Sequence, residues 1–202
     1  MKRRKFLGLL GATGLSGLSG CVDPVQNAFS PTDQGHTRIE NIRTDVSPVE
    51  FNLQFTTEVE DRVSTESNPM GVSIALRNDG SNNITVAGSN NEAFSSQEST
   101  DGNLLLVEPT FWDEELIVSG NCWKMKKQKP ILSTESQSTF RPSESESETY
   151  HLIGSPFNDG CIPPGSYRFE TEFQIIVGKE SQRRVNGEFT WGFVVEVSNA
   201  QK

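Results

Sequence analysis

The strongest constraint on the fold is an alternation of apolar and polar residues in the C-terminal part of the chain. Apolar residues, with one threonine among them, recur at every second position from Tyr167 to Val177 and again from Phe189 to Val197. A period of two is that of a β-strand with one buried face. The polar segment 178–187 would join these strands as an antiparallel hairpin whose aromatic face meets a second sheet. No segment keeps a convincing helical period, so the sequence predicts an all-β protein.

Further strands are predicted by shorter apolar runs elsewhere in the chain. Four runs are clear, and four weaker ones are centred near single residues: 51–55, 72–76, 84–86 and 104–107, then Ile39, Trp123, Phe140 and Tyr150. Turn residues such as Asn78-Asp79-Gly80 separate them. This spacing predicts an antiparallel β-sandwich of about eight to ten strands. Two polar segments, 95–102 and 133–149, are predicted to be loops.

The first twenty residues have the order of an export signal. A cationic block, Lys2 to Lys5, is followed by an uncharged, glycine-rich run from Phe6 to Gly20. A bilayer span needs about 20 predominantly apolar residues, and each glycine costs a helix roughly 1 kcal/mol relative to alanine. The run is therefore expected to be a cleavable signal, with an uncleaved anchor of the same topology as the alternative.

Two motifs in this segment resemble known export signals. Arg3 and Arg4, followed by Phe6 and Leu7, resemble the twin-arginine translocation motif. Leu18-Ser19-Gly20-Cys21 resembles a lipobox, in which the cysteine becomes the lipidated first residue. The resemblance implies a signal peptide over 1–20, a lipidated Cys21 with a flexible tether over 21–36, and a sandwich domain over 37–202. The expected location is the extracellular face of the cell membrane, with the lipid on Cys21 as the membrane anchor.

The charge of the chain disfavours a nucleic-acid partner. The net charge is −9, and removing the four cationic residues of the signal takes the remaining body to −13, which phosphates would repel. Four of the six lysines in that body lie close together, at Lys124, Lys126, Lys127 and Lys129. They form a candidate contact patch for anionic lipid headgroups or an acidic surface glycoprotein. The alternative is an exposed strand edge that lysines protect from aggregation.

The cysteines divide into one plus two. If Cys21 carries lipid, Cys122 and Cys161 remain as a pair in an oxidising compartment, where a disulfide is expected over free thiols. Closing that loop would stabilise the fold by about 4 kcal/mol. Cys122 is out of phase with Trp123, so the bridge is expected to tie a loop to a strand end. Tyr167, which follows Pro-Pro-Gly-Ser, either caps nearby backbone with its hydroxyl or simply packs in the core.

The region from about Gly120 to Val177 resembles a lipoprotein family. The residues that carry the resemblance are Cys122-Trp123-Lys124, the acid-rich strand start before Tyr150, and Cys161 to Phe169. They resemble haloarchaeal twin-arginine-exported lipoproteins with immunoglobulin-like sandwiches. The acidic, lysine-poor body agrees, because such surfaces stay hydrated in concentrated salt. The resemblance implies an immunoglobulin-like fold and a surface location, and it implies no reaction.

Enzyme signatures are scarce. The chain has two histidines, and only His151 is placed where a hydrolase could use it. We find neither a Gly-x-Ser-x-Gly motif nor a zinc ligand set, and we expect no enzyme activity, cofactor or metal. Asn83-Ile84-Thr85 fits the N-glycosylation pattern.

The functional expectation is a non-catalytic surface lipoprotein that binds or organises an envelope protein or glycan. Its ligand contacts are expected on the loops 95–102, 133–148 and 154–165. The alternative is a protease inhibitor, or an accessory subunit of an envelope enzyme or transporter, that presents one of these loops.

Overall fold

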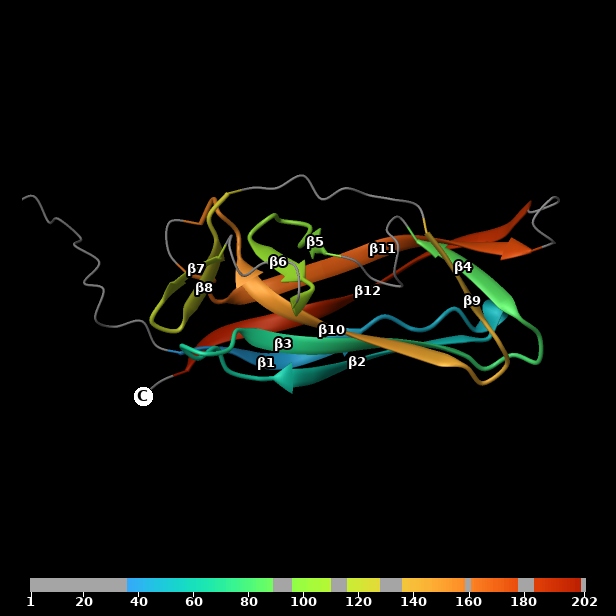
Figure 1. Cartoon of the computed structure of the whole chain (residues 1–202), viewed down its shortest axis with the longest axis horizontal. Helices are drawn as coiled ribbons and strands as arrows, with labels where there is room; N and C mark the ends of the chain where they lie inside the picture. The colour runs from blue at the N-terminus through green and yellow to red at the C-terminus, as the bar shows by residue number, and fades with distance from the viewer. Residues whose placement is uncertain are drawn as a thin grey trace, which may run out of the picture. The chain divides into compact units, whose positions relative to one another are not determined.

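The computed structural model describes residues 36–88, 96–109, 116–127, 136–158, 161–177 and 184–200 (Figure 1). The chain divides into two units, Met1–Asp33 and Gln34–Lys202, and all the described residues belong to the second. The expectations for the export signal, Cys21, the tether up to residue 35 and Lys129 therefore lie outside the described residues. His36, expected as the last tether residue, is the first residue of a strand.

The described residues form twelve strands and one short 3-10 helix. The strands are β1 (His36–Thr44), β2 (Leu53–Asp61), β3 (Met70–Asn78), β4 (Ile84–Gly88), β5 (Gln97–Glu98), β6 (Leu104–Val107), β7 (Leu116–Ser119), β8 (Cys122–Met125), β9 (Ser136–Phe140), β10 (Ser145–Gly154), β11 (Gly165–Val177) and β12 (Arg184–Ala200). One sheet has the order β1-β12-β11-β4-β9, and the other has the order β2-β3-β10-β6-β5. The hairpin of β7 and β8 joins the second sheet through a parallel contact of β8 with β10.

Seven of these strands have the neighbours of an immunoglobulin-like sandwich. In chain order, β2, β3, β4, β6, β10, β11 and β12 take the places of strands A to G. The sheet β2-β3-β10-β6 then corresponds to ABED, and β12-β11-β4 corresponds to GFC. The predicted antiparallel sandwich is confirmed. The described residues form twelve strands where eight to ten were expected. The difference is β5 and β7, which are short and were not predicted.

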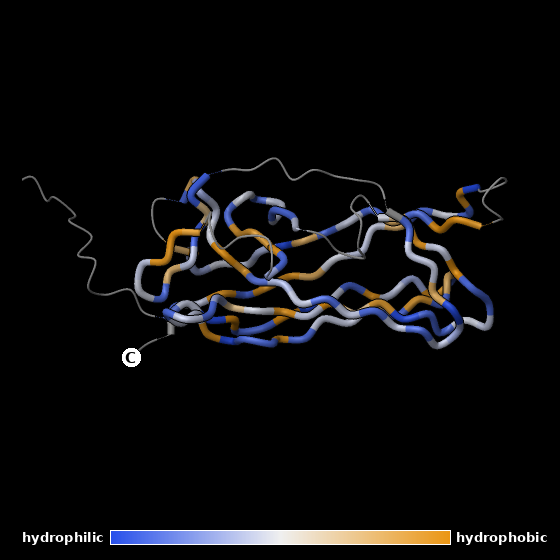
Figure 2. Tube along the Cα trace, in the orientation of Figure 1, coloured by the Kyte–Doolittle hydropathy of each residue, from blue (hydrophilic) through white to orange (hydrophobic). Residues whose placement is uncertain are grey.

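The long hairpin of β11 and β12 supplies much of the core. Its register runs from Gly165 opposite Val197 to Val177 opposite Arg184, and its apolar face packs against the second sheet. Trp191 is fully buried and stacks on Phe55 of β2, with ring centroids 4.5 Å apart. Hydrophobic and hydrophilic residues alternate along the strands of both sheets (Figure 2). The apolar residues of the alternating pattern thus lie on the core-facing side of the β11–β12 pair, and the polar residues lie on the other side.

A second, smaller core lies on the opposite face of β6 and β10. Leu105, Val107 and Ile153 point there and pack with Met125 of β8, while Leu104 and Leu106 point into the main core. Since the β7–β8 hairpin covers this face, all four residues of β6 are buried. The uninterrupted apolar run 104–107 is the sequence pattern of a strand that is buried on both sides.

Of the two predicted loops, 133–149 is largely strand, and 95–102 contains a strand of only two residues. Within 133–149, β9 and the start of β10 are joined by a short turn, and residues 145–147 are exposed while they pair with β3. Within 95–102, Gln97 and Glu98 form β5. Polar residues on solvent-facing strand positions carry no apolar period, and this is why both segments resembled loops.

The strand expected over 51–55 begins later than predicted. Val49–Phe51 is a 3-10 turn, and Asn52 has a left-handed φ of 54° before β2 starts at Leu53. Phe51 reaches the core from this turn, with its ring centroid 5.5 Å from that of Phe189. Phe51 lies two positions before Leu53 and four before Phe55, so the alternating pattern included it in the strand that it precedes.

Candidate functional site

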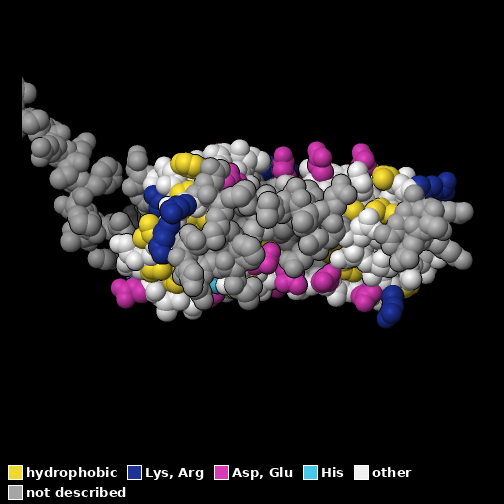
Figure 3. Space-filling model, turned by 45° about the horizontal axis from the view of Figure 1, so that its top comes forward, with side chains coloured by type: hydrophobic (Ala, Val, Ile, Leu, Met, Phe, Trp, Pro, Cys, Tyr) yellow, Lys and Arg dark blue, Asp and Glu magenta, His cyan; other side chains and the backbone are white. Residues whose placement is uncertain are grey.

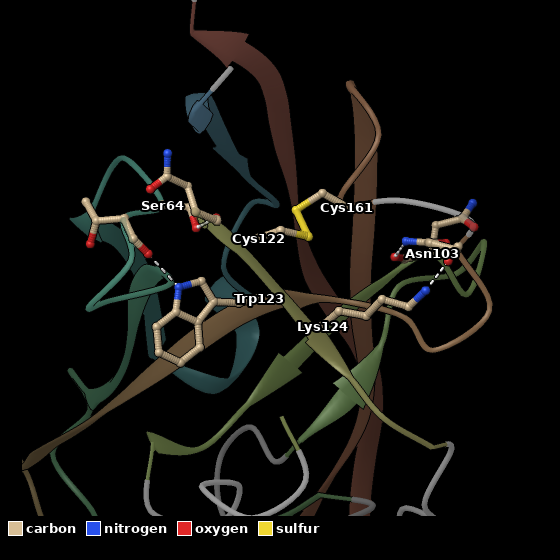
Figure 4. Close-up of a disulfide and its surroundings, with 9 residues drawn as sticks. Ser64, Asn103, Cys122, Trp123, Lys124 and Cys161 are labelled. Carbon is tan, nitrogen blue, oxygen red and sulfur yellow. Dashed lines mark hydrogen bonds between the residues drawn. A yellow bond between two sulfur atoms is a disulfide. The ribbon is translucent and has the colours of Figure 1, made fainter. Parts of the chain in front are cut away.

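A disulfide closes one end of the sandwich. Cys122 is the first residue of β8, and Cys161 lies in the loop that leads to β11; their sulfur atoms are bonded and their Cα atoms are 5.4 Å apart. Figure 4 shows the bond between the hairpin strand and this loop. The expected tie of a strand end to a loop is confirmed. It differs from the bridge of antibody domains, which joins strands B and F across the core.

Trp123 and Lys124 point to opposite sides of β8 (Figure 4). The indole nitrogen of Trp123 donates a hydrogen bond of 2.7 Å to the carbonyl of Thr65. The ammonium of Lys124 donates to the carbonyl of Asn158 in the loop after β10. Lys124 is thus part of the internal structure rather than of an open basic patch. Of the other lysines in the expected patch, Lys126 and Lys127 are exposed.

A polar turn supports the loop after β10 from the other side. Ser99, expected in a segment too polar to pack, is buried and donates to Asp101. The carbonyl of Asn103 accepts hydrogen bonds from the backbone of Ser155, at 3.1 Å, and from the side chain of Asn158, at 2.8 Å. Burial opposes ionisation of Asp101, but hydrogen bonds from Ser99 and Asn103 outweigh it and hold the pKa of Asp101 below its ordinary value.

Tyr167 fastens the same loop to the core. Its ring is buried, and its hydroxyl donates to the carbonyl of Pro163 four residues upstream. This is the backbone-capping arrangement of a tyrosine corner at the start of strand F, and Tyr167 also packs in the core, so both predicted roles are present. Burial, and then the charge of Asp101, raise the pKa of Tyr167 to about 12.

The body also begins at this end. The imidazole Nδ1 of His36, the first residue of β1, lies 3.3 Å from the carbonyl of Ser64. The amide of Ser64 donates to the carbonyl of Thr37, and its hydroxyl donates to the carbonyl of Asn121, the residue before Cys122. The start of the sandwich, the β7–β8 turn and the disulfide are therefore joined by direct contacts.

A separate open cavity of about 430 Å³ lies on the GFC sheet. Its polar lining includes Glu172 and Gln174 of β11, Glu188 of β12 and Gln137 of β9. The side-chain amide of Gln174 donates a hydrogen bond of 2.9 Å to the carboxylate of Glu188. The residues come from strands that are far apart in sequence, β4 and β9 included. No local sequence motif marks the cavity, and the sequence prediction missed it.

The other predicted residues lie apart from both regions. Asn83 is exposed in the turn before β4, where a glycan would meet solvent. His151 lies in β10, with Gly71 of β3 on one side and Val107 of β6 on the other. Among the residues that the structure describes, no group of three histidine, cysteine or acidic side chains could hold a metal ion. Over the same residues, no helix is long and apolar enough to cross a membrane.

Comparison with protein-family models, with curated proteins and with solved structures finds no match to this chain.

Proposed function

We propose that the chain is an exported lipoprotein, anchored through Cys21 on the extracellular face of the membrane, whose sandwich is a non-catalytic binding module. The order of charges, apolar residues and lipobox in residues 1–21 supports the anchor. The acidic body supports a haloarchaeal setting, in which binding takes place in concentrated salt. Neither point says where a ligand binds.

The observation that carries the binding function is the cavity on the GFC sheet. In β12 its lining runs from Glu188 to Thr190, ten to twelve residues before Ala200, which pairs with His36. At about 3.3 Å per residue, the cavity lies about 35 Å along the strand from the point where the body begins. A protein anchored ahead of His36 holds this cavity away from its attachment point.

The chemistry of the cavity suits a ligand with many hydroxyl groups. The carboxylates of Glu172 and Glu188 accept hydrogen bonds, and the amides of Gln137 and Gln174 both donate and accept them. Its size is within the range of small-ligand sites, roughly 300–1,000 Å³. We therefore assign the cavity to an envelope glycan, in place of the three segments that the sequence favoured.

Binding to glycans released from the host's surface glycoproteins tests this assignment. Calorimetry in concentrated salt should give saturable binding. The Glu172→Gln, Glu188→Gln double variant should bind at least tenfold more weakly (about 1.4 kcal/mol or more), because each substitution replaces one acceptor oxygen with an NH2 donor. Glu60→Gln, at an exposed position of β2 in the other sheet, is the matched control and should bind as the wild type does. Equal binding by the double variant would contradict the assignment.

The anchor has its own test. A Cys21→Ser variant should appear in the medium instead of the membrane fraction. Retention on the membrane would instead indicate that the signal stays uncleaved.

The inhibitor or accessory-subunit alternative would present one of the segments 95–102, 133–148 and 154–165 to an envelope enzyme. The last of these lies at the end where the body begins, so an anchored protein would present it toward the membrane. We favour the binding module because the cavity lies away from that end. Stoichiometric inhibition of a host envelope protease by the purified protein would reverse the preference.

A further inference from the structure

Exposed apolar side chains gather beside the disulfide. Ile117 of β7 is 44% exposed, and Phe157, in the loop after β10, is 70% exposed. Val118 is 45% exposed as well, but it lies opposite Trp123, on the other side of the hairpin. Ile117 lies opposite Lys124, and Lys124 donates to Asn158, the neighbour of Phe157. We call Ile117 and Phe157, with the exposed Lys126 and Lys127, the hairpin face.

The hairpin face is held in place from both sides. The disulfide joins β8 to the loop that follows Phe157, and the Asn103 carbonyl fixes Ser155 and Asn158 on either side of it. Because the backbone of this loop is already ordered, burying the exposed Phe157 side chain in a binding partner loses little conformational entropy.

Charge distinguishes this end from most of the body. Lys and Arg side chains lie among hydrophobic ones at the end that carries β7 and β8 and again at the opposite end, while most acidic side chains of this view lie between the two ends (Figure 3). With a net charge of −13 after signal removal, the body is repelled by an anionic surface at its acidic faces. The hairpin face combines exposed cations with exposed apolar side chains.

The described residues begin, at His36, close to the hairpin face. Fourteen residues, 22–35, lie between the lipobox cysteine and His36, and a chain of this length reaches at most about 50 Å when fully extended. His36 is joined through Ser64 to the β7–β8 turn. A tether of this reach gives the hairpin face a high effective concentration at the bilayer, so a weak contact suffices to orient the body.

We propose that the hairpin face contacts the lipid bilayer, with Phe157 and Ile117 in the boundary between headgroups and acyl chains and the lysines at lipid phosphates. This inference rests on the proposed anchor and adds an orientation to it: the disulfide end lies on the membrane and the GFC cavity faces outward. In concentrated salt the lysine attraction is screened within a few ångström, and the apolar side chains carry the contact. In dilute salt both act.

Fluorescence quenching by brominated lipid chains tests the contact in the anchored protein. A fluorescent amino acid replaces Phe157 in one sample and Val185 in the other; Val185 is 49% exposed and pairs with Ile176 near the opposite end of β11. Each lipidated protein is reconstituted into vesicles of phosphatidylcholine with phosphatidylglycerol. We expect quenching several-fold stronger at position 157 than at position 185.

The outcomes separate this inference from the anchor. Protein that sediments with the vesicles but is quenched equally at the two positions, or at neither, overturns the inference and leaves the anchor standing. Protein that does not sediment overturns the anchor and the orientation together. If the protein forms dimers without lipid and the Phe157→Ser variant is monomeric, the hairpin face binds a second copy of the chain. That result also overturns the inference.

A substitution pair tests the same contact without a label. In the secreted Cys21→Ser protein, Phe157→Ser should lower the vesicle partition coefficient roughly tenfold, and Val185→Ser should leave it unchanged. Lys126→Gln with Lys127→Gln should weaken partitioning at about 0.1 M salt and have little effect at several molar. Unchanged partitioning of the Phe157→Ser protein, with an unaltered unfolding curve, would refute the contact.

Discussion

Removal of the disulfide should destabilise the protein by about 4 kcal/mol. The bridge joins Cys122 and Cys161, which are 39 positions apart in sequence. In the chain-entropy model, closing a loop of about 40 residues lowers the entropy of the unfolded chain by about 13 cal/mol/K, which is about 4 kcal/mol at 25 °C. A domain of this kind has a total stability of about 5–15 kcal/mol, so the loss is a large share of the whole.

Urea unfolding of the Cys122→Ala, Cys161→Ala double variant measures this loss. With an m-value of about 2 kcal/mol/M, the midpoint should fall by about 2 M. The wild type under reducing conditions should show a similar fall, because both perturbations open the same loop. Cys21→Ser is the matched control and should leave the midpoint unchanged. A loss below about 1 kcal/mol in the double variant would refute the reasoning, since an intact bridge must constrain the unfolded chain.

Two further predictions concern β11 and β12. Gly192→Ala should cost about 3 kcal/mol or more, because a Cβ there would stand 2.1 Å from the carbonyl oxygen of Phe169 and the strand ladder would have to shift. Gly71→Ala, whose Cβ would meet nothing closer than 3.4 Å, is the control, and equal losses in urea unfolding would contradict the account. Tyr167→Phe should cost about 1 kcal/mol through the lost hydrogen bond to Pro163. Burial raises the pKa of Tyr167 from 10.0 to about 12, so the unfolded chain loses this proton first and wild-type stability should fall between those pH values. Tyr167→Phe should flatten that part of the stability–pH curve, and an unchanged slope would refute the assignment.

The main hairpin could be predicted from sequence because its pattern is local. Each buried residue of β11 from Tyr167 to Ile175 is flanked by a more exposed one, and alternation of this kind identifies both the strand and its buried face. The same alternation, at Val72, Ile74 and Leu76, identified β3. It failed for β5 and for the start of β10, because their residues are polar and show no apolar period.

The sites depended on contacts that a linear pattern does not contain. The cysteine pairing followed from counting, and the phase of Trp123 correctly placed Cys122 on the other side of β8. The internal role of Lys124 could not be predicted, because its partner is a backbone carbonyl in a loop 34 positions away. The cavity was missed for a related reason: β4, β9, β11 and β12 each contribute residues that look like ordinary exposed strand positions.

The lipid on Cys21 is the central claim, because both the binding function and the orientation assume an anchor ahead of His36. Mass spectrometry of the N-terminal peptide of the protein purified from its host's membranes tests it most directly. The account predicts a peptide that begins at Cys21 and carries the added mass of lipid. A peptide that begins at Met1, or an unmodified Cys21, would contradict it.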